Sequence, residues 1–190
     1  MSNNKLLRFT LSGMFLALGL VLPFLTGQIQ QIGSMLLPMH IPVILCGLVC
    51  GWKFGLGVGL IMPLLRSAVF SMPVFYPNAV AMAFELAAYG FIIGFLFEKS
   101  KWKCLKSLYK CLFAGMIGGR LIWGVAMVAL LGLNGGEFTL SAFVSGAFLN
   151  AIPGIVLQLV AIPAIMLILK KSHFYITEEK KDGRKIPESN

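Results

Sequence analysis

The sequence predicts an all-α membrane protein, a bundle of six transmembrane helices with both termini in the cytoplasm. Of its 190 residues, 58% are hydrophobic and 12% are charged, and the mean hydropathy is +0.87. Soluble domains carry roughly 25% charged residues. Apolar runs of about 18 residues or more recur, each long enough to cross a hydrocarbon core of roughly 30 Å. Nearly all lysines and arginines lie just outside these runs. Together these observations indicate one bundle and no soluble domain.

The first two expected helices differ in length. The first, 6–25, follows two basic residues as a signal peptide would, but it is too long for an h-region and lacks an obvious cleavage site, so we expect it to be retained. The second, 40–51, is only about 18 Å long. Pro38 and Pro42 prevent a regular helix before it. Irregular backbone at membrane depth is tolerated where it lines a cavity, so we expect this end to face a site.

The remaining expected helices are 54–70, 78–97, 112–131 and 141–169. The last is longer than one crossing requires, so we expect it to tilt or to kink around Pro153 and Pro163. Residues 1–170 would form the bundle. The segment 171–190 is charged and rich in helix breakers, which predicts a disordered cytoplasmic tail.

The positive charges set the expected orientation. Except for Arg66 and Arg120, the lysines and arginines lie in the N-terminal stretch, at Lys53, in 98–110 and in the tail. The three loops between these segments hold none, so the basic segments are predicted to be cytoplasmic. The same placement excludes a nucleic-acid groove despite the net charge of +9. We therefore expect a multi-pass protein in a prokaryotic cell membrane, with lipid around it.

Two motifs invite a functional interpretation that their context does not support. Four cysteines occur without a histidine nearby, so we expect reduced, packing thiols and no metal; they are Cys46, Cys50, Cys104 and Cys111. The glycines at 51, 55 and 59 resemble a phosphate loop, but no strand precedes them and no Lys-Ser/Thr follows. Their four-residue spacing predicts close helix packing, and no cofactor is expected.

Several side chains that lipid disfavours lie at membrane depth. A charge at the bilayer centre costs at least about 2.5 kcal/mol, so such groups indicate a functional site. At 1.5 Å per residue, Arg66 lies roughly 8 Å from the outer end of its helix, and Glu85 lies roughly 10 Å below Asn78. We expect one layer in the outer half of the membrane to hold the substrate-binding candidates Arg66, Asn78, Glu85, Arg120, Trp123, Asn150, Tyr76 and His40.

The charges in this layer predict the kind of ligand. Two arginines and one glutamate leave one net positive charge in a medium of low dielectric constant. A carboxylate would complete the balance through bidentate hydrogen bonds. The hypothesis is therefore a site for a small anionic or zwitterionic solute, open to the outside.

Structural roles for the same residues remain open. Glu85 with either arginine could form a purely structural ion pair, and His40 could be an interfacial residue. Asn150 and Gln158 could join helices through hydrogen bonds. The aromatic candidates, Tyr76 and Trp123, could belong to the interfacial belt or to the core.

Three stretches resemble the substrate-binding S components of energy-coupling factor (ECF) vitamin transporters. They are a small-residue face at Gly13 and Ala17, the run LPMHIPVILCGLVCGWKFGLGVG and the run FELAAYGFIIGFLFEK. The resemblance covers nearly the whole chain apart from the tail. Its MHIPV-type stretch is most like the pantothenate group or its unassigned relatives.

The resemblance implies a mechanism. Such a subunit binds a vitamin or precursor from outside and topples to carry it inward. It docks on a membrane T component through small residues of its first helix, best matched here by Gly13 and Ala17, and two cytoplasmic ATPases supply the energy. Pantothenate would suit Arg66 or Arg120 with Asn78 and Asn150. Riboflavin is the competing vitamin and would need ring stacking.

Other classes of protein fit less well. A membrane enzyme needs a nucleophile–base pair or several metal ligands, and the chain has two histidines and no clustered carboxylates. A stand-alone channel or secondary transporter usually carries carboxylates at broken helices and internal repeats. We see neither several such carboxylates nor a repeat. A structural assembly subunit remains a further alternative.

Overall fold

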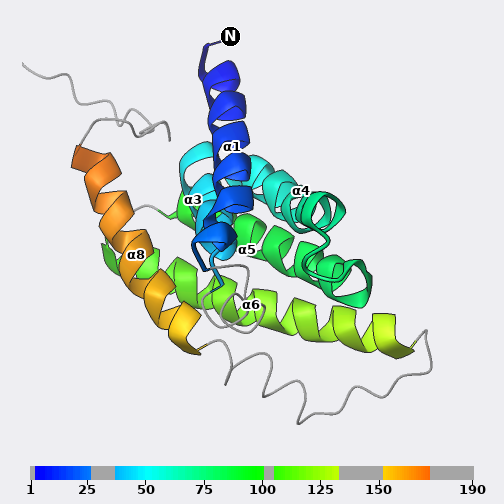
Figure 1. The fold of residues 1–190 in the computed structure, drawn as a ribbon. Coiled ribbons are helices and arrows are strands. Elements are labelled where there is room, and N and C mark those ends of the chain that lie inside the picture. Colours follow the sequence, from blue (N-terminus) through cyan, green and yellow to red (C-terminus); the bar gives the residue numbers. More distant parts are fainter. Residues whose placement is uncertain (1–2, 27–36, 101–104, 133–151, 172–190) are drawn as a thin grey trace, which may run out of the picture.

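The computed structural model describes residues 3–26, 37–100, 105–132 and 152–171, and these residues contain helices and no strand (Figure 1). In chain order the elements are α1 (Asn3–Val21), the short helix η1 (Leu22–Thr26), α3 (His40–Cys50), α4 (Trp52–Phe70), the π-helical turn η2 (Phe75–Ala79), α5 (Val80–Lys99), α6 (Leu105–Gly132) and α8 (Ile152–Lys171).

Five of the described helices are long and apolar enough to cross a membrane, and α3 is a shorter apolar helix of 11 residues. The prediction of an all-helical, multi-pass membrane protein is therefore confirmed. Six crossings and cytoplasmic termini stay predictions. The start expected for the last helix at 141 and the tail expected over 171–190 lie outside the described residues, apart from Lys171 at the end of α8.

Helix α6 begins seven residues before the predicted start at 112. The error came from reading the lysines of 98–110 as a loop. In the structure Leu108, Cys111 and Leu112 are buried while Lys106 and Lys110 are exposed. Apolar residues three to four apart make this stretch an amphipathic extension of the helix. The basic residues lie on its exposed side.

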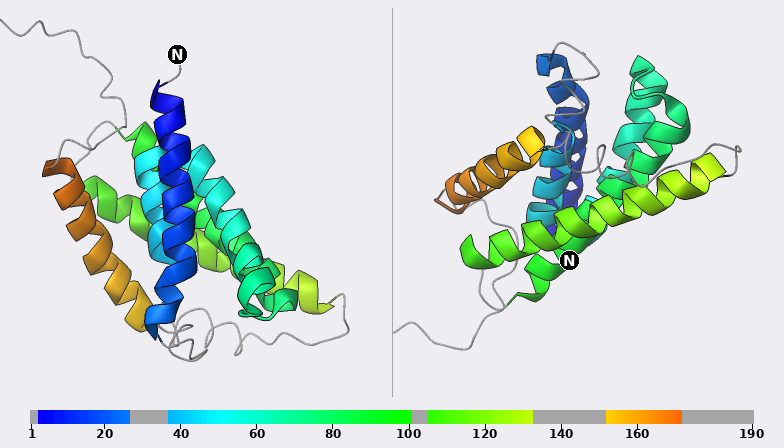
Figure 2. Two further views of the ribbon diagram at one scale, coloured as in Figure 1. Left: turned by 45° about the horizontal axis from the view of Figure 1, so that its top comes forward. Right: turned by 90° about the horizontal axis from the view of Figure 1, so that it is seen from below.

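The short helix α3 forms the centre of the bundle. All of its residues are buried, and it packs against α1, α4, α5 and α8 (Figures 1 and 2). A helix that is apolar all round is stable only when neighbours cover every side. Gly51, at a φ of 99°, makes the turn from α3 into α4, a conformation that favours glycine.

Glycines bring the backbones of α3, α4 and α5 into direct contact. A Cβ atom built on Gly47 would lie 2.7 Å from the carbonyl oxygen of Gly90. One built on Gly55 would lie 2.6 Å from the Cα of Gly47, and one on Gly59 would lie 2.4 Å from the carbonyl oxygen of Leu86. The glycines at 55 and 59 therefore serve close helix packing, as their spacing predicted.

Candidate substrate-binding site

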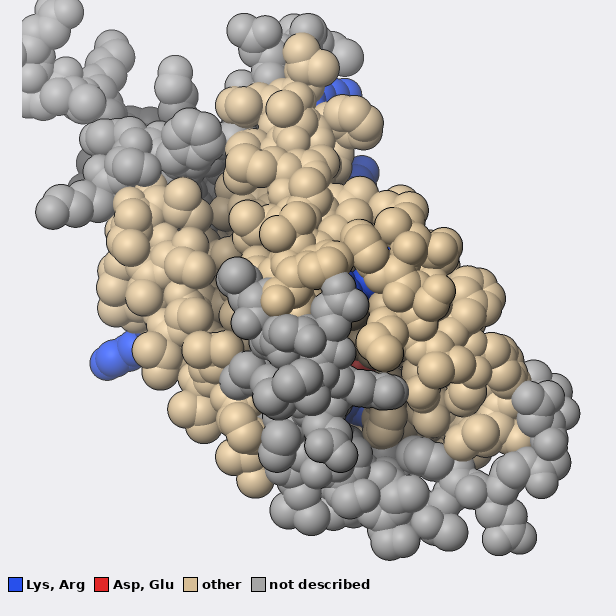
Figure 3. Space-filling model, viewed as in Figure 1, with Lys and Arg blue, Asp and Glu red and all other residues tan. Residues whose placement is uncertain are grey.

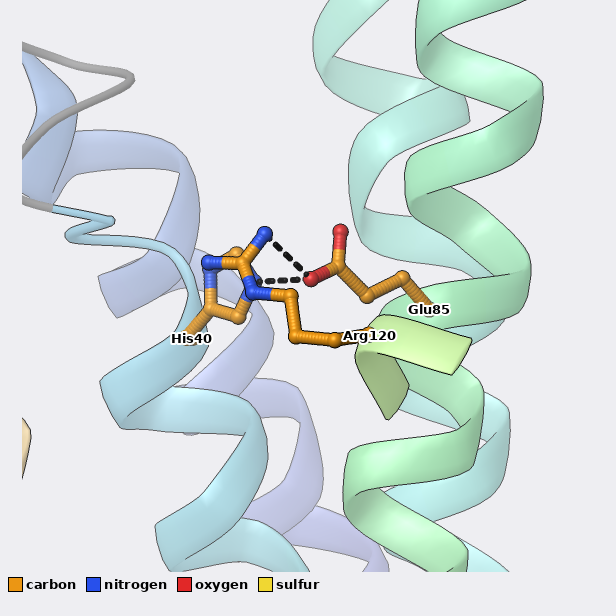
Figure 4. Close-up of polar contacts among 3 residues, drawn as sticks. All are labelled: His40, Glu85 and Arg120. Carbon is orange, nitrogen blue, oxygen red and sulfur yellow. Dashed lines mark ion pairs between the residues drawn. The ribbon is translucent and has the colours of Figure 1, made fainter. Parts of the chain in front are cut away.

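Three buried, ionisable side chains from three helices meet in the interior (Figure 4). Glu85 extends from α5, and its Oε1 lies 2.9 Å from Nη1 of Arg120 on α6. The same oxygen lies 3.4 Å from Nε2 of His40 at the start of α3. The side chains are 2%, 5% and 1% exposed, respectively. The second carboxylate oxygen points away from both partners (Figure 4). The sequence placed His40, Glu85 and Arg120 among the candidates for substrate binding, and the structure brings these three together; their role in binding stays a prediction.

The triad of His40, Glu85 and Arg120 keeps unused hydrogen-bonding groups. Arg120 contacts Glu85 through Nη1, but its buried Nε and Nη2 have no hydrogen-bond partner among the described residues. Both imidazole nitrogens of His40 are likewise buried without one in that part of the chain. The Nε–H and one Nη2–H lie along one edge of the planar guanidinium, where they fit a carboxylate bidentately. An unsatisfied buried donor costs free energy, so this edge is where the triad is able to hold a carboxylate.

Tyr89 packs against the triad. It follows Glu85 by one turn of α5, and its ring meets that of His40 edge to face, with centroids 5.1 Å apart. On its other side the ring lies against Gly119, next to Arg120. The sequence placed Tyr89 on the same helix face as Glu85, but we did not predict it as a site residue. The four-residue spacing and the glycine before Arg120 are the signals that could have identified it.

Arg66 lies in a different environment from the triad. Its Nη1 donates a hydrogen bond of 2.9 Å to the carbonyl oxygen of Leu20, near the C-terminus of α1. Its guanidinium carbon lies 5.6 Å from the ring centres of both Phe24 and Phe70. Among the described residues Arg66 forms no ion pair with Glu85. The carboxylate of Glu85 pairs with Arg120 and not with Arg66. The negative charge of Glu85 and the positive charge of Arg120 therefore balance each other.

The other predicted site residues in the described part of the chain lie on η2 and α6. The hydroxyl of Tyr76 donates a hydrogen bond to the carbonyl oxygen of Leu130 and so ties η2 to the last turn of α6. Asn78 is a half-buried residue of η2, and Trp123 is half-buried on α6, three residues after Arg120. Asn150 lies outside the described residues.

One further polar residue is buried without a role assigned by the sequence. Gln158 on α8 is 1% exposed, and neither its Oε1 nor its Nε2 has a partner in the described segments. Sequence reasoning considered it only as a residue that joins helices. The sequence offered one signal for a role of Gln158 beyond helix packing: it is the one polar side chain in the apolar stretch 152–169.

Charge is scarce on the face shown in Figure 3. Few red and blue atoms are visible there, and most of the described surface is tan. In the part of the chain that the structure describes, no group of three or more His, Cys, Asp and Glu residues is arranged to hold a metal ion. The described cysteines, Cys46, Cys50 and Cys111, are buried and free.

Two small residues of α1 face away from the bundle. Gly13 and Ala17 are exposed, and a Cβ atom on Gly13 would have nothing within 4 Å. The opposite face of α1 buries Leu11 and Phe15 in the core. Exposed apolar residues surround the small ones, among them Phe9, Met14 and Val21.

A comparison with protein families matches residues 7–169 to the model described as ECF transporter, substrate-specific component. Comparisons with curated proteins and with solved structures gave no match. The match covers most of the chain and includes every helix of the triad. The chain therefore belongs to the family of substrate-specific (S) components of ECF transporters, which are substrate-binding subunits of membrane transporters and not enzymes.

Proposed function

We propose that this chain captures a small organic anion, with a pantothenate-like carboxylate favoured, from outside a prokaryotic cell. It delivers the solute inward by toppling in a complex with a T component and two cytoplasmic ATPases. In this proposal six segments cross the membrane and both termini are cytoplasmic. The chain itself carries no nucleotide-binding motif, so its partners hydrolyse ATP.

The free edge of Arg120 carries the proposal. Its Nε and Nη2 are buried without a hydrogen-bond partner among the described residues, while Nη1 lies 2.9 Å from Oε1 of Glu85. A carboxylate accepts two parallel hydrogen bonds from such an edge. Because the guanidinium is held before the solute arrives, little conformational entropy is lost on binding.

His40 completes the charge balance in this proposal. With a carboxylate bound, the buried layer holds two negative groups, the solute and Glu85, and one positive group, Arg120. His40, with Nε2 3.4 Å from Oε1 of Glu85, can supply a compensating positive charge, which matters because uncompensated buried charge is costly.

The exposed small-residue face of α1 supports docking to a membrane partner. Small residues let two helices approach closely in lipid, where packing drives association. Gly13 and Ala17 present such a face outward, and nothing in the described bundle covers Gly13. We propose that the T component packs here.

Binding to the purified chain tests the substrate. Affinities are measured for pantothenate, for panthenol, which has an alcohol in place of the carboxylate, and for riboflavin. We expect binding of pantothenate, at least about tenfold weaker binding of panthenol, and loss of this preference in Arg120→Gln. Tight binding of riboflavin instead, unaffected by Arg120→Gln, would contradict the anion site.

Transport in liposomes tests the class of transporter. Radiolabelled pantothenate should enter vesicles that contain the T component, both ATPases and internal ATP, and not vesicles that contain this chain alone. Gly13→Leu, which fills the small-residue face, should abolish the ATP-driven uptake and leave the affinity for pantothenate unchanged. Uptake by the chain alone would instead identify a stand-alone secondary transporter or channel.

A further inference from the structure

Helix α8 buries an amide that the bundle does not use. Gln158 is 1% exposed, and both polar atoms of its side chain are without a hydrogen-bond partner among the described residues. An amide in an apolar interior without partners destabilises the fold. Nearly all buried side-chain amides in proteins are satisfied, so each exception calls for an explanation.

The packing of α8 places this amide in the interior shared with the triad. Gln158 lies on the same helix face as Ile162 and Met166, which belong to the hydrophobic core that also contains Tyr89. Within the described residues α8 packs against α3 and α6, the helices that supply His40 and Arg120.

A hydrogen bond fixes where α8 meets α6. The hydroxyl of Tyr109 on α6 donates to the carbonyl oxygen of Leu159, at 3.3 Å. The views in Figures 1 and 2 likewise show α8 beside the first turns of α6. Arg120 lies eleven residues beyond Tyr109, about 16 Å along the helix axis. The α8 contact at Tyr109 and the arginine thus lie about three turns apart along α6, which favours separate functional groups of one solute at Gln158 and at Arg120.

We infer that Gln158 binds the uncharged, polar far end of an elongated solute whose carboxylate is held by Arg120. This inference rests on the proposed function and specifies its substrate class. A primary amide offers one acceptor oxygen and two donor hydrogens. It therefore complements a ureide, an amide or a diol, each of which carries both a donor and an acceptor. A hydrocarbon end would leave the amide unpaired.

The test uses three carboxylates that differ at the far end. Biotin ends in a ureide, pantothenate ends in a diol, and octanoate ends in a methyl group. Their affinities are measured for the full-length wild type, for Gln158→Met, which keeps the length of the side chain without hydrogen bonds, and for Leu157→Met. The last places the same side chain on the adjacent, exposed position of α8. The melting temperature of each protein is measured without solute and with each carboxylate.

We expect the wild type to bind biotin or pantothenate more tightly than octanoate. Gln158→Met should lower the affinity for the preferred solute by about tenfold or more and leave the affinity for octanoate unchanged. Without solute, Gln158→Met should melt at the same or a higher temperature than the wild type, because an unsatisfied amide has been removed. Leu157→Met should behave as the wild type does.

Two results would overturn the inference and leave the proposed function intact. One is an unchanged affinity of Gln158→Met for the preferred carboxylate. The other is a lower melting temperature without solute together with an equal loss for all three carboxylates, which would identify Gln158 as a residue that joins helices. If the wild type binds none of the three, or if Arg120→Gln binds them as the wild type does, the anion site itself is wrong and this inference fails with it.

Discussion

Tyr89 on α5 fills the space that a side chain at position 119 of α6 would occupy. A Cβ atom on Gly119 would lie 2.6 Å from Cε2 of the Tyr89 ring and 2.7 Å from Cδ2. The same ring contacts His40 edge to face. Because residue 119 has no side chain, α6 approaches closely enough for Arg120 to reach Glu85.

Replacing Gly119 with alanine should therefore damage the site. The aromatic ring cannot shift as the tip of a flexible side chain can, so Gly119→Ala should force α5 and α6 apart and cost about 1–3 kcal/mol. We expect a lower melting temperature and weaker binding of pantothenate. Gly57→Ala is the matched control, because a Cβ atom there would have nothing within 4 Å. Equal effects of both variants would contradict the role assigned to the contact with Tyr89.

The pair of Glu85 and Arg120 can be tested by a double-mutant cycle. Glu85→Gln leaves a buried guanidinium without its counter-charge, and Arg120→Met leaves a buried carboxylate without its own. Each should lower the free energy of unfolding by about 3–5 kcal/mol. The double variant should be less destabilised than either single variant, because no unpaired charge remains. The free energy of unfolding of each variant is measured by reversible unfolding in mixed detergent micelles. If the losses of the two single variants simply add in the double variant, the two residues are independent, and the predicted pair is wrong.

His40 should matter for the binding of an anion. Its imidazole Nε2 lies 3.4 Å from Oε1 of Glu85, where it can offset a second buried negative charge. His40→Gln should therefore weaken the binding of pantothenate by about tenfold and leave the binding of uncharged panthenol unchanged. Equal losses for both solutes would contradict the role assigned to this imidazole.

Arg66 should affect the stability of α1 more than the affinity for a solute. Its positive charge at the C-terminus of α1 and its position against two phenylalanine rings both favour the docking of this helix. Arg66→Gln should lower the melting temperature and change the affinity for pantothenate less than about twofold. The melting temperature of Arg66→Lys should lie between those of the wild type and Arg66→Gln, since lysine keeps the charge and loses the planar stacking group. Loss of binding in Arg66→Gln would place this arginine in the site, as expected from the sequence.

The fold was largely predictable from hydropathy and helix breakers. Runs of apolar residues bounded by glycine, proline and lysine gave most helix boundaries within a few residues, because lipid requires long continuous helices. The start of α6 was missed because lysines alone do not end a helix. Its first turns continue as an amphipathic segment that is stabilised by tertiary packing.

The cluster of buried ionisable residues could be predicted in its members but not in its ion pairs. The sequence put His40, Glu85 and Arg120 at membrane depth, where burial needs partners, and the structure brings them together. The sequence could not choose between Arg66 and Arg120 as the partner of Glu85. That choice depends on the direction in which each helix faces, and here it is set by Gly119 and Tyr89. Gln158 looked like one more residue that joins helices, because hydrogen-bond partners cannot be counted without coordinates.

The glycine contacts of Gly47, Gly55 and Gly90 have a mechanical consequence. With main chains touching and no side chains between them, α3, α4 and α5 have no layer of rotatable groups to absorb a displacement, and they move as one piece. His40 and Glu85 belong to that piece, whereas Arg120 belongs to α6. In the proposed function, release of the solute would therefore change the position of Arg120 on α6 relative to Glu85, and not the packing of α3, α4 and α5 against one another.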